Sequence, residues 1–296
     1  MIEALFKELD GAFAENTLRA YRADFAHFAS WCKARDIDPW ESTAVQWADY
    51  VAALEPTHAA ATIRRRMNSL NSLFKFVERT PHRGSRAVRL ALRRMHRRKG
   101  RRQRQATPLT MTVLKALLPH CDGTPRGQRD RILLMLGYET MRRRAELVRY
   151  RFANLEVRSR DRYAILLERS KTDQFADGHL IGLSPVLGRA LVAWHGQIGD
   201  GPILRPIHNG VLLPRGLEAG AVNRILRRLQ RDAGLTAIGA LSGHSFRVGR
   251  ALDLLEQGET LEKIMLRGGW KSDSSAISYL RAWHPEASNL DEDAYE

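Results

Sequence analysis

The stretch SGHSFRVGRALDLLEQGETLEKIMLRGGWKSDSSAISYLR, residues 242–281, sets His244 and Arg247 three residues apart at the start of a helical apolar pattern. Residues three apart on a helix share a face, so these two side chains are expected to project together. Trp270 follows, and Tyr279 stands nine residues after it. The plainest interpretation makes both aromatic residues part of the buried face of a short helix. Whether they take part in chemistry depends on the rest of the chain.

The chain is strongly basic. It has 296 residues, of which 44% are hydrophobic, enough for one large domain or two ordinary ones. Its 48 lysines and arginines outnumber the 33 acidic residues by 15, and 40 of the 48 are arginines. The guanidinium fork matches phosphate oxygens, so this excess favours a polyanionic partner, nucleic acid before an acidic membrane surface.

The cysteines and the apolar runs indicate the cellular compartment of the protein. Cys32 and Cys121 cannot staple a fold of this size and show no metal-ligand spacing, which suits a reducing cytosol. The opening residues, MIEALFKELDGAF, lack the positive flank and apolar run of a signal peptide. The longest apolar runs, such as LLML at 133–136, are too short to span a bilayer. We therefore expect a cytoplasmic protein that is not embedded in a membrane.

The first hundred residues predict helices only. Apolar residues recur at three- and four-residue steps in 15–34, 41–54, 58–77 and 85–98. Ser42 or Thr43 is the expected N-cap of the second helix. The fourth helix is predicted to divide into an apolar face, with Val88, Ala91, Leu92 and Met95, and a cationic face, with Arg86, Arg89, Arg93 and Arg97.

A basic segment follows the fourth helix. Residues 83–104 contain eleven lysines or arginines and no acidic residue. Such a run is most often a solvated face or a disordered tail, but KGRRQRQATP breaks the helix before a second periodic segment begins at Thr110. We place an interdomain linker at 99–107. A basic linker between two lobes suits a clamp around a duplex.

The second half of the chain predicts a mixed lobe. Helices are expected at 110–119, 126–149, 185–195, 218–233, 244–257, 260–267 and 272–283. Three short strands, LEVRS, YAILLE and HLIGL, lie between the second and third of these helices, and SKTDQFADG forms the turn that joins the last two strands.

Polar pairs in this lobe are individually weak signals. A histidine three residues before an arginine is expected about once by chance in so arginine-rich a chain. Arg143 and Glu146 in ETMRRRAELVRY share a helix face, but an exposed ion pair is worth little. A lysine in a hairpin turn, such as Lys171, is usually only solvated.

Taken in order, these fragments resemble a known family. RRAEL, the hairpin lysine, HSFR, GGW and a tyrosine nine residues later are similar to the motifs of the tyrosine recombinases, also called phage integrases. The likeness extends to the N-terminal lobe through ENTLRAYRADFAHFASWC and covers most of the chain. It implies a mainly α fold with a small antiparallel β-sheet, arranged as a two-lobe DNA clamp. The implied domains are a SAM-like helical core-binding domain (1–98), the linker (99–107), a mixed α+β catalytic domain (108–284) and an acidic tail (285–296).

The resemblance assigns Tyr279 as the nucleophile that attacks a DNA phosphate, forming a 3′-phosphotyrosyl bond and freeing a 5′-hydroxyl. A phosphodiester under attack gains charge on its non-bridging oxygens, which Arg143 and Arg247 can stabilise. Three arginines are consecutive at 142–144. Arg143 fits because it stands three residues before Glu146, so loss of its neighbours is expected to leave substantial activity.

Four further residues complete the predicted active site. His244 is the candidate base or hydrogen-bond partner of the nucleophile, whose pKa near 10 makes it weak at neutral pH. Lys171 is the candidate general acid for the departing 5′-oxygen. Trp270 takes a position that many family members fill with histidine, and its indole N–H can donate to a phosphate. Glu146 is expected to orient Arg143 or His244. No cofactor is expected, because the protein–DNA bond conserves the energy of the phosphodiester and no carboxylate cluster suits Mg²⁺.

Base and backbone contacts are predicted from helical faces. The helix at 217–234 is the expected major-groove element, and its contacts are assigned to Asn223, Arg224 and Arg227. The contacts assigned to the N-terminal half and the linker are Arg64, Arg65, Asn68, Arg86, Arg89, Arg93, Arg97, Arg101 and Arg102. The tail, EASNLDEDAYE, either docks into a neighbouring protomer, as in the family, or is a frayed end.

Three functions fit these residues. The first is a DNA-associated bacterial or phage recombinase that acts on double-stranded DNA with inverted-repeat sites, as a homotetramer on two sites and as a monomer or dimer before synapsis. The second is a type IB topoisomerase-like or telomere resolvase-like enzyme, which the compact length disfavours. The third is a non-enzymatic DNA-binding protein on a recombinase scaffold, which would be expected to have lost a catalytic side chain.

Overall fold

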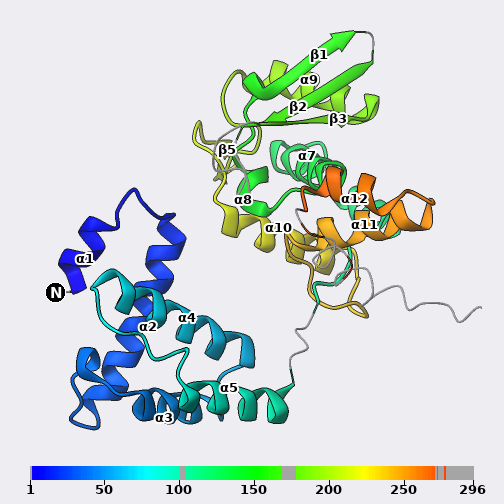
Figure 1. The fold of residues 1–296 in the computed structure, drawn as a ribbon. Helices are drawn as coiled ribbons and strands as arrows, with labels where there is room; N and C mark the ends of the chain where they lie inside the picture. Colours follow the sequence, from blue (N-terminus) through cyan, green and yellow to red (C-terminus); the bar gives the residue numbers. More distant parts are fainter. Residues whose placement is uncertain are drawn as a thin grey trace, which may run out of the picture. The chain divides into compact units, whose positions relative to one another are not determined.

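The computed structural model of the chain divides into two compact units, Met1–Arg104 and Gln105–Glu296 (Figure 1). It describes residues 2–100, 105–159, 161–168, 178–270, 272 and 277. Within these residues, no helix combines the length and the apolar character needed to cross a membrane. Each unit has a hydrophobic core of its own.

The named elements of the N-terminal unit, within its described residues, are all helices joined by loops. Its elements are α1 (Ile2–Glu8), α2 (Glu15–Lys33), η1 (Pro39–Glu41), α3 (Ala44–Leu54), α4 (Ala60–Phe76) and α5 (Arg86–Lys99). Helix α3 begins at the predicted cap, because the Thr43 hydroxyl accepts from the Gln46 backbone N–H while the Gln46 side chain accepts from that of Thr43. Trp47 and Tyr50 of α3 are fully buried against Phe28 of α2.

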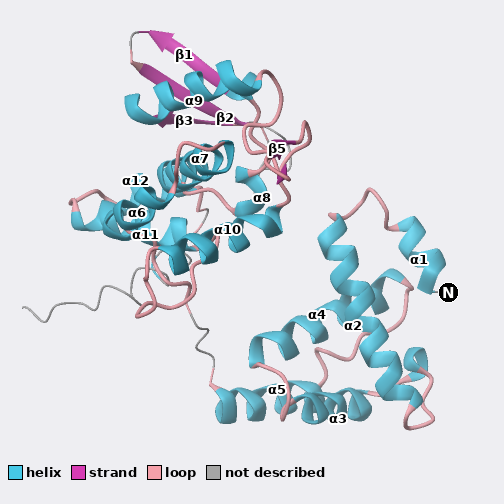
Figure 2. Cartoon of the chain, turned by 180° about the vertical axis from the view of Figure 1, so that it is seen from behind, coloured by secondary structure: helices cyan, strands magenta, loops and turns pink. Residues whose placement is uncertain are grey.

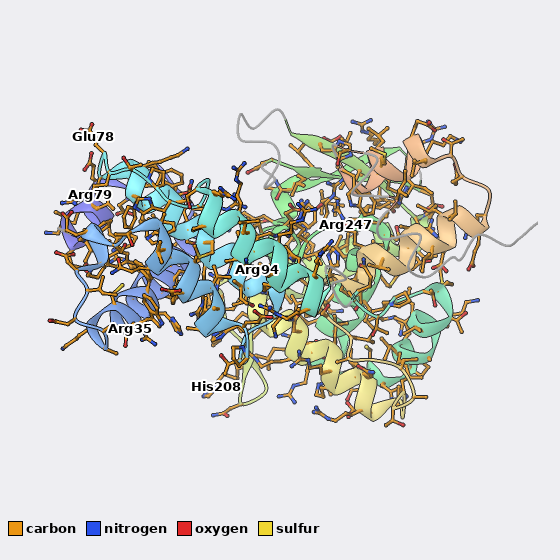
Figure 3. The ribbon with its side chains drawn as sticks, turned by 60° about the horizontal axis from the view of Figure 1, so that its bottom comes forward. Arg35, Glu78, Arg79, Arg94, His208 and Arg247 are labelled. Atoms are coloured by element: carbon orange, nitrogen blue, oxygen red, sulfur yellow. The ribbon has the colours of Figure 1, made fainter. Side chains whose placement is uncertain are left out.

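Helix α5 confirms the predicted division into two faces. Ser85 caps its first turn through a hydrogen bond from the Val88 backbone N–H. Val88, Leu92 and Met95 are buried against the core of this unit. The opposite face carries exposed arginines, of which Arg94 is labelled in Figure 3. The helix ends at Gly100, whose positive φ is costly for other residues.

The C-terminal unit places helices around a small sheet. Its helices are α6 (Met111–Leu117), η2 (Leu118–His120), α7 (Pro125–Thr140), α8 (Arg144–Leu147), η3 (Phe152–Asn154), α9 (Pro185–Ile198), α10 (Ala219–Asp232), α11 (Ser245–Glu256) and α12 (Leu261–Gly268). Its strands are β1 (Leu155–Ser159), β2 (Arg162–Leu167), β3 (His179–Leu183), β4 (Ile207–His208) and β5 (Val211–Leu212).

The predicted strands form an antiparallel sheet in the order β1-β2-β3. Helix α9 lies across this sheet in both ribbon views (Figures 1 and 2). The approach is close at Gly188, where a Cβ atom would stand 2.0 Å from the Tyr163 ring. Helix α7 is buried beneath, and its Gly137 leaves room for the Phe246 ring of α11. The fold class predicted from the sequence is therefore confirmed.

One predicted helix is wrong in a way that matters for the site. The segment 126–149 is not one helix, because α7 ends at Thr140 and Met141 takes a left-handed conformation with φ of 54°. This conformation costs a non-glycine residue on the order of 1 kcal/mol. Tertiary contacts hold it there, since the Met141 carbonyl accepts a hydrogen bond from Arg247. A period of 3.6 residues continues through the break, so the apolar pattern could not locate it.

Some elements have no counterpart among the predicted ones. Helix α1 and the hairpin of β4 and β5 are examples. Asn209 and Gly210 make the turn of this hairpin, both with positive φ. Asn-Gly is a strong hairpin signal, so the sequence did contain the information. The predicted helix at 272–283 lies outside the described residues, apart from Ser272 and Ile277.

Candidate active site

Arg247 lies at the centre of the candidate site, buried at 1% exposure near the start of α11 (Figure 3). Its Nη1 donates to the Met141 carbonyl at 3.3 Å. Its guanidinium stands 3.9 Å from the centroid of the Trp270 ring, a cation–π arrangement. A carbonyl dipole and an aromatic face thus fix a cation that never loses its proton under ordinary conditions.

The two glycines before Trp270 explain how the ring reaches Arg247. Helix α12 ends at Gly268, and Gly269 caps it in the left-handed region with φ of 66°. A Cβ atom on Gly268 would stand 2.1 Å from the Trp270 ring, so a side chain there would displace the ring. The GGW sequence therefore favours this local structure: the helix ends at Gly268, the chain turns at Gly269, and the Trp270 indole packs on the Arg247 guanidinium.

The three consecutive arginines have different environments. Arg142 is buried at 3% exposure and donates from Nη2 to the Arg267 carbonyl at 2.8 Å. The Arg143 side chain is 31% exposed. Arg144 is exposed. Arg143 is the one that combines access to solvent with a fixed partner.

Glu146 is that partner. Its carboxylate is buried and accepts from the Arg143 guanidinium and from the Arg143 backbone N–H, each at 3.0 Å. The bond from the backbone N–H also satisfies a donor at the N-terminal end of α8. The predicted orienting role of Glu146 thus has a geometric basis toward Arg143.

His244 occupies the N-cap position of α11, on a loop held by two hydrogen bonds. The Asn223 side chain accepts from the Gly243 backbone N–H, and the Ser245 hydroxyl accepts from that of Ser242, both at 2.9 Å. Burial, together with the positive charges of Arg247 and Arg143, lowers the pKa of His244 to about 4. The imidazole is therefore neutral at pH 7, and the effect of both arginines places the three residues in one site.

This pKa predicts a pH dependence of stability. The unfolded chain binds a proton at His244 near pH 6.5, whereas the folded chain does so only near pH 4. Stability therefore falls as pH drops through this window, by on the order of 3 kcal/mol for this group. In urea unfolding of the full chain between pH 7 and pH 4, His244→Gln should lose stability less steeply than wild type. Equal slopes would contradict a buried neutral His244.

The predicted catalytic residues thus separate into two groups. Arg143, Glu146, His244, Arg247 and Trp270 are brought together. Lys171 and Tyr279 lie outside the described residues, as do the acidic tail at 285–296, Arg101 and Arg102. Within the described ranges, no three His, Cys, Asp or Glu side chains cluster as a metal site would require.

The predicted DNA contacts of the N-terminal unit are exposed. Arg64 and Asn68 on α4 are open to solvent, as are the arginines assigned on α5, namely Arg86, Arg89, Arg93 and Arg97. Arg65 is half-exposed and pairs with Asp24 at 2.5 Å, where Asp24 is itself buried and also accepts from Ser69. The ion pair with Asp24 restrains the Arg65 side chain and neutralises part of its charge.

The three residues assigned to DNA contact on α10 differ in exposure and in their hydrogen bonds within the protein. Arg224 and Arg227 are exposed. The oxygen of the Asn223 amide is occupied by the loop that carries His244. Sequence reasoning missed this supporting role because the contact joins residues 20 apart in the chain. Arg228, on the same helix, pairs with Asp130 and Asp232 and so packs the unit.

Two fixed arginines, a neutral histidine and an indole thus share one site on a helical scaffold, as the resemblance to the tyrosine recombinases predicted. Residues 107–284 match the profile of the phage integrase family, and residues 2–80 match that of the phage integrase N-terminal SAM-like domain. The first match spans more than half of the chain. The protein therefore belongs to the phage integrase family of site-specific tyrosine recombinases, as the sequence motifs predicted.

Two relatives are similar over nearly the whole chain. "Recombinase cre" of Escherichia phage P1 is 28% identical, with 91% of this chain and 85% of the relative covered. "Integrase/recombinase xerD homolog" of Selenomonas ruminantium is 29% identical, with 93% and 84% covered. Among solved structures, the lambda integrase (residues 75–356) dimer bound to a COC′ core site has a TM-score of 0.69 at 17% identity, covering 98% of both chains. The Tn1549 transposon integrase with transposon right end DNA gives 0.67 at 14% identity and 93% coverage of both.

Proposed function

We propose that this recombinase cleaves and rejoins DNA through a 3′-phosphotyrosyl intermediate and exchanges strands between two sites. The observation that carries the proposal is the convergence of Arg143, His244, Arg247 and Trp270, with Glu146 fixing Arg143. The oxygen of Tyr279 attacks phosphorus, the bond from phosphorus to the 5′-oxygen breaks, and Lys171 gives that oxygen a proton. Attack by the 5′-hydroxyl of another strand reverses the step, so ATP is not needed.

The arginines supply the largest share of the rate. Charge accumulates on the non-bridging oxygens of phosphorus as the tyrosine attacks, and fixed guanidinium groups stabilise it without reorganising. Arg247 is held by the Met141 carbonyl and Trp270, and Arg143 is held by Glu146. The Trp270 indole N–H supplies one more donor to phosphate.

His244 fits a role that begins when DNA binds. With a pKa of about 4, it is too weak a base to take the tyrosine proton efficiently in the free protein. Burial is the main cause of this low pKa, and the charges of Arg247 and Arg143 add to it; a bound phosphate offsets the part that is due to the arginines. DNA binding therefore raises the basicity of His244 at the moment when the Tyr279 proton must leave.

Double-stranded DNA with inverted-repeat recombination sites is the proposed partner. The chain acts as a homotetramer on two sites and as a monomer or dimer before synapsis, without a cofactor. Similar structures support this, since lambda integrase binds a core site as a dimer and a Holliday junction as a tetramer. Contacts come from the exposed arginines of α4, α5 and α10, with 1–98 as the core-binding domain, 99–107 as the linker and 108–284 as the catalytic domain.

We infer that the protein works in the cytoplasm on bacterial or phage DNA.

The test is to trap the covalent intermediate. The purified protein is incubated with DNA from its host, denatured and digested with nuclease, and its peptides are examined by mass spectrometry. A nucleotide attached to the peptide that contains Tyr279 is expected, and sequencing the trapped DNA identifies the site. DNA binding without any adduct would instead favour the non-enzymatic DNA-binding protein, which the retention of all the described site residues disfavours.

The charge of the chain predicts a strong salt dependence. Non-specific DNA affinity should fall with salt at a slope of log K against log salt steeper than about −4, because many phosphates are neutralised. Fluorescence anisotropy with a duplex of unrelated sequence measures this slope over a salt series. A shallower slope would contradict a clamp that makes many phosphate contacts.

A further inference from the structure

A set of arginine-to-carbonyl hydrogen bonds ties the two halves of the candidate site together. Arg142 donates from Nη2 to the Arg267 carbonyl at 2.8 Å. Arg267 in turn donates from Nε to the Glu139 carbonyl at 3.0 Å and from Nη2 to the Gly182 carbonyl at 3.3 Å. The segment that precedes Arg143 is therefore bonded to the last turn of α12, which precedes Trp270. We call Arg142, Arg267 and the carbonyls that they bind the arginine brace.

The contact of Arg142 with the turn before Trp270 is close. A Cβ atom on Gly269 would stand 2.5 Å from Nη1 of Arg142, so this guanidinium packs directly on the glycine. Gly269 is the left-handed cap that redirects the chain. Arg142 thus holds both the Arg267 carbonyl in the last turn of α12 and the residue that reverses the direction of the chain.

A gain in folding stability does not by itself explain why Arg142 and Arg267 are buried here. Neither Arg142 nor Arg267 forms an ion pair with a carboxylate among the described residues, and burial lowers the pKa of both. Removing a guanidinium from water costs several kcal/mol unless good hydrogen bonds replace hydration. An apolar residue of similar volume would fill the space at lower cost. Two of the three bonds suit their acceptors, because the Arg267 and Glu139 carbonyls lie at the C-terminal ends of α12 and α7, where carbonyls carry partial negative charge.

We propose that Arg142 is a positioning residue for the recombination reaction, which holds the turn at Gly269 so that the Trp270 indole stays on the Arg247 guanidinium. The inference rests on the proposed function. It replaces the expectation, drawn from the sequence, that removing Arg142 leaves substantial activity. Arg142 acts through Trp270 and Arg247, because its guanidinium is buried and bonded to the protein.

The substitution to test is Arg142→Met, which keeps an unbranched apolar stem and removes the donors. Its matched control is Arg144→Met, which removes a positive charge two residues away from an exposed side chain. Strand cleavage in a single turnover, on the DNA site found by trapping, should slow on the order of 10²-fold in Arg142→Met. DNA affinity and the melting temperature should stay near those of wild type, and Arg144→Met should cleave at close to the wild-type rate.

A double-substitution cycle separates positioning from a general structural role. If Arg142 acts through the indole, Arg142→Met should slow cleavage far less in a Trp270→Phe background than in wild type. Equal effects in both backgrounds, or full activity of Arg142→Met, would overturn the proposal. So would a lower melting temperature with activity restored on cooling, because that is the signature of lost stability.

A second readout does not depend on catalysis. The chain has six tryptophans, and 5-fluorotryptophan labelling gives each a fluorine resonance, with that of Trp270 assigned by its loss in Trp270→Phe. This resonance should shift in Arg142→Met and not in Arg144→Met. An unchanged resonance would overturn the brace. A wild-type protein that forms no adduct with DNA would overturn the proposed function, while the fluorine result would still stand for the brace.

Discussion

Tyr279→Phe is expected to abolish the covalent adduct with DNA while leaving DNA affinity unchanged. Phenylalanine keeps the ring and removes the only atom that can bond to phosphorus. Without the phenolic oxygen no covalent bond to phosphorus can form at this residue, so the adduct should fall below the detection limit. Incubation with the cognate site, followed by denaturing electrophoresis, shows the adduct as a band of reduced mobility.

The control for this experiment is another tyrosine in the same unit. Tyr163→Phe removes a phenolic hydroxyl from β2 without touching the predicted chemistry, and its adduct yield should match that of wild type. An adduct that persists in Tyr279→Phe would mean that another side chain is the nucleophile. The peptide that carries the nucleotide would then identify it.

Arg143→Ala should slow strand cleavage by 10²-fold or more, corresponding to on the order of 3 kcal/mol or more of lost transition-state stabilisation. Two effects act together in this variant. The phosphate loses a guanidinium, and the buried Glu146 carboxylate loses its partner at 3.0 Å. Single-turnover cleavage with the protein in excess over DNA isolates this step from binding.

Comparison with Arg144→Ala tests the register of the arginines. Arg144 is exposed and one residue further along the chain, so its loss should leave cleavage close to wild type. If Arg144→Ala lost activity while Arg143→Ala kept it, the register assigned from Glu146 would be off by one. Arg143→Lys should recover little of the lost rate, because an ammonium group lacks the planar fork.

Much of the fold could be predicted from local signals. The two faces of α5 follow from apolar residues at helical spacing above a serine cap, and both are observed. The three main strands follow from short β-branched or aliphatic runs around turn residues. The hairpin at Asn209 and Gly210 was missed although its turn chemistry is explicit, because two-residue strands carry almost no periodic pattern.

The candidate site divides in the same way. The resemblance to the tyrosine recombinases predicted that Arg143, His244, Arg247 and Trp270 share one site, and the structure brings them together. The left-handed Met141, which turns its carbonyl toward Arg247, depends on a contact between residues 106 apart. Local sequence cannot report such a contact. Lys171 and Tyr279 lie outside the described residues, so their roles stay predictions, as do the DNA contacts.

The stacking of Arg247 between a carbonyl and an indole also has an entropic consequence. A free arginine side chain loses up to about 2 kcal/mol of rotamer freedom when it is immobilised. Arg247 is already held in place in the folded chain, so its side-chain entropy is lost during folding and not when DNA binds. Arg64, Arg224 and Arg227, which are exposed and predicted to contact DNA, would lose their rotamer freedom only on binding. Substitutions at these three positions are therefore expected to change which DNA is bound, and how tightly, while Arg247 stays pre-organised.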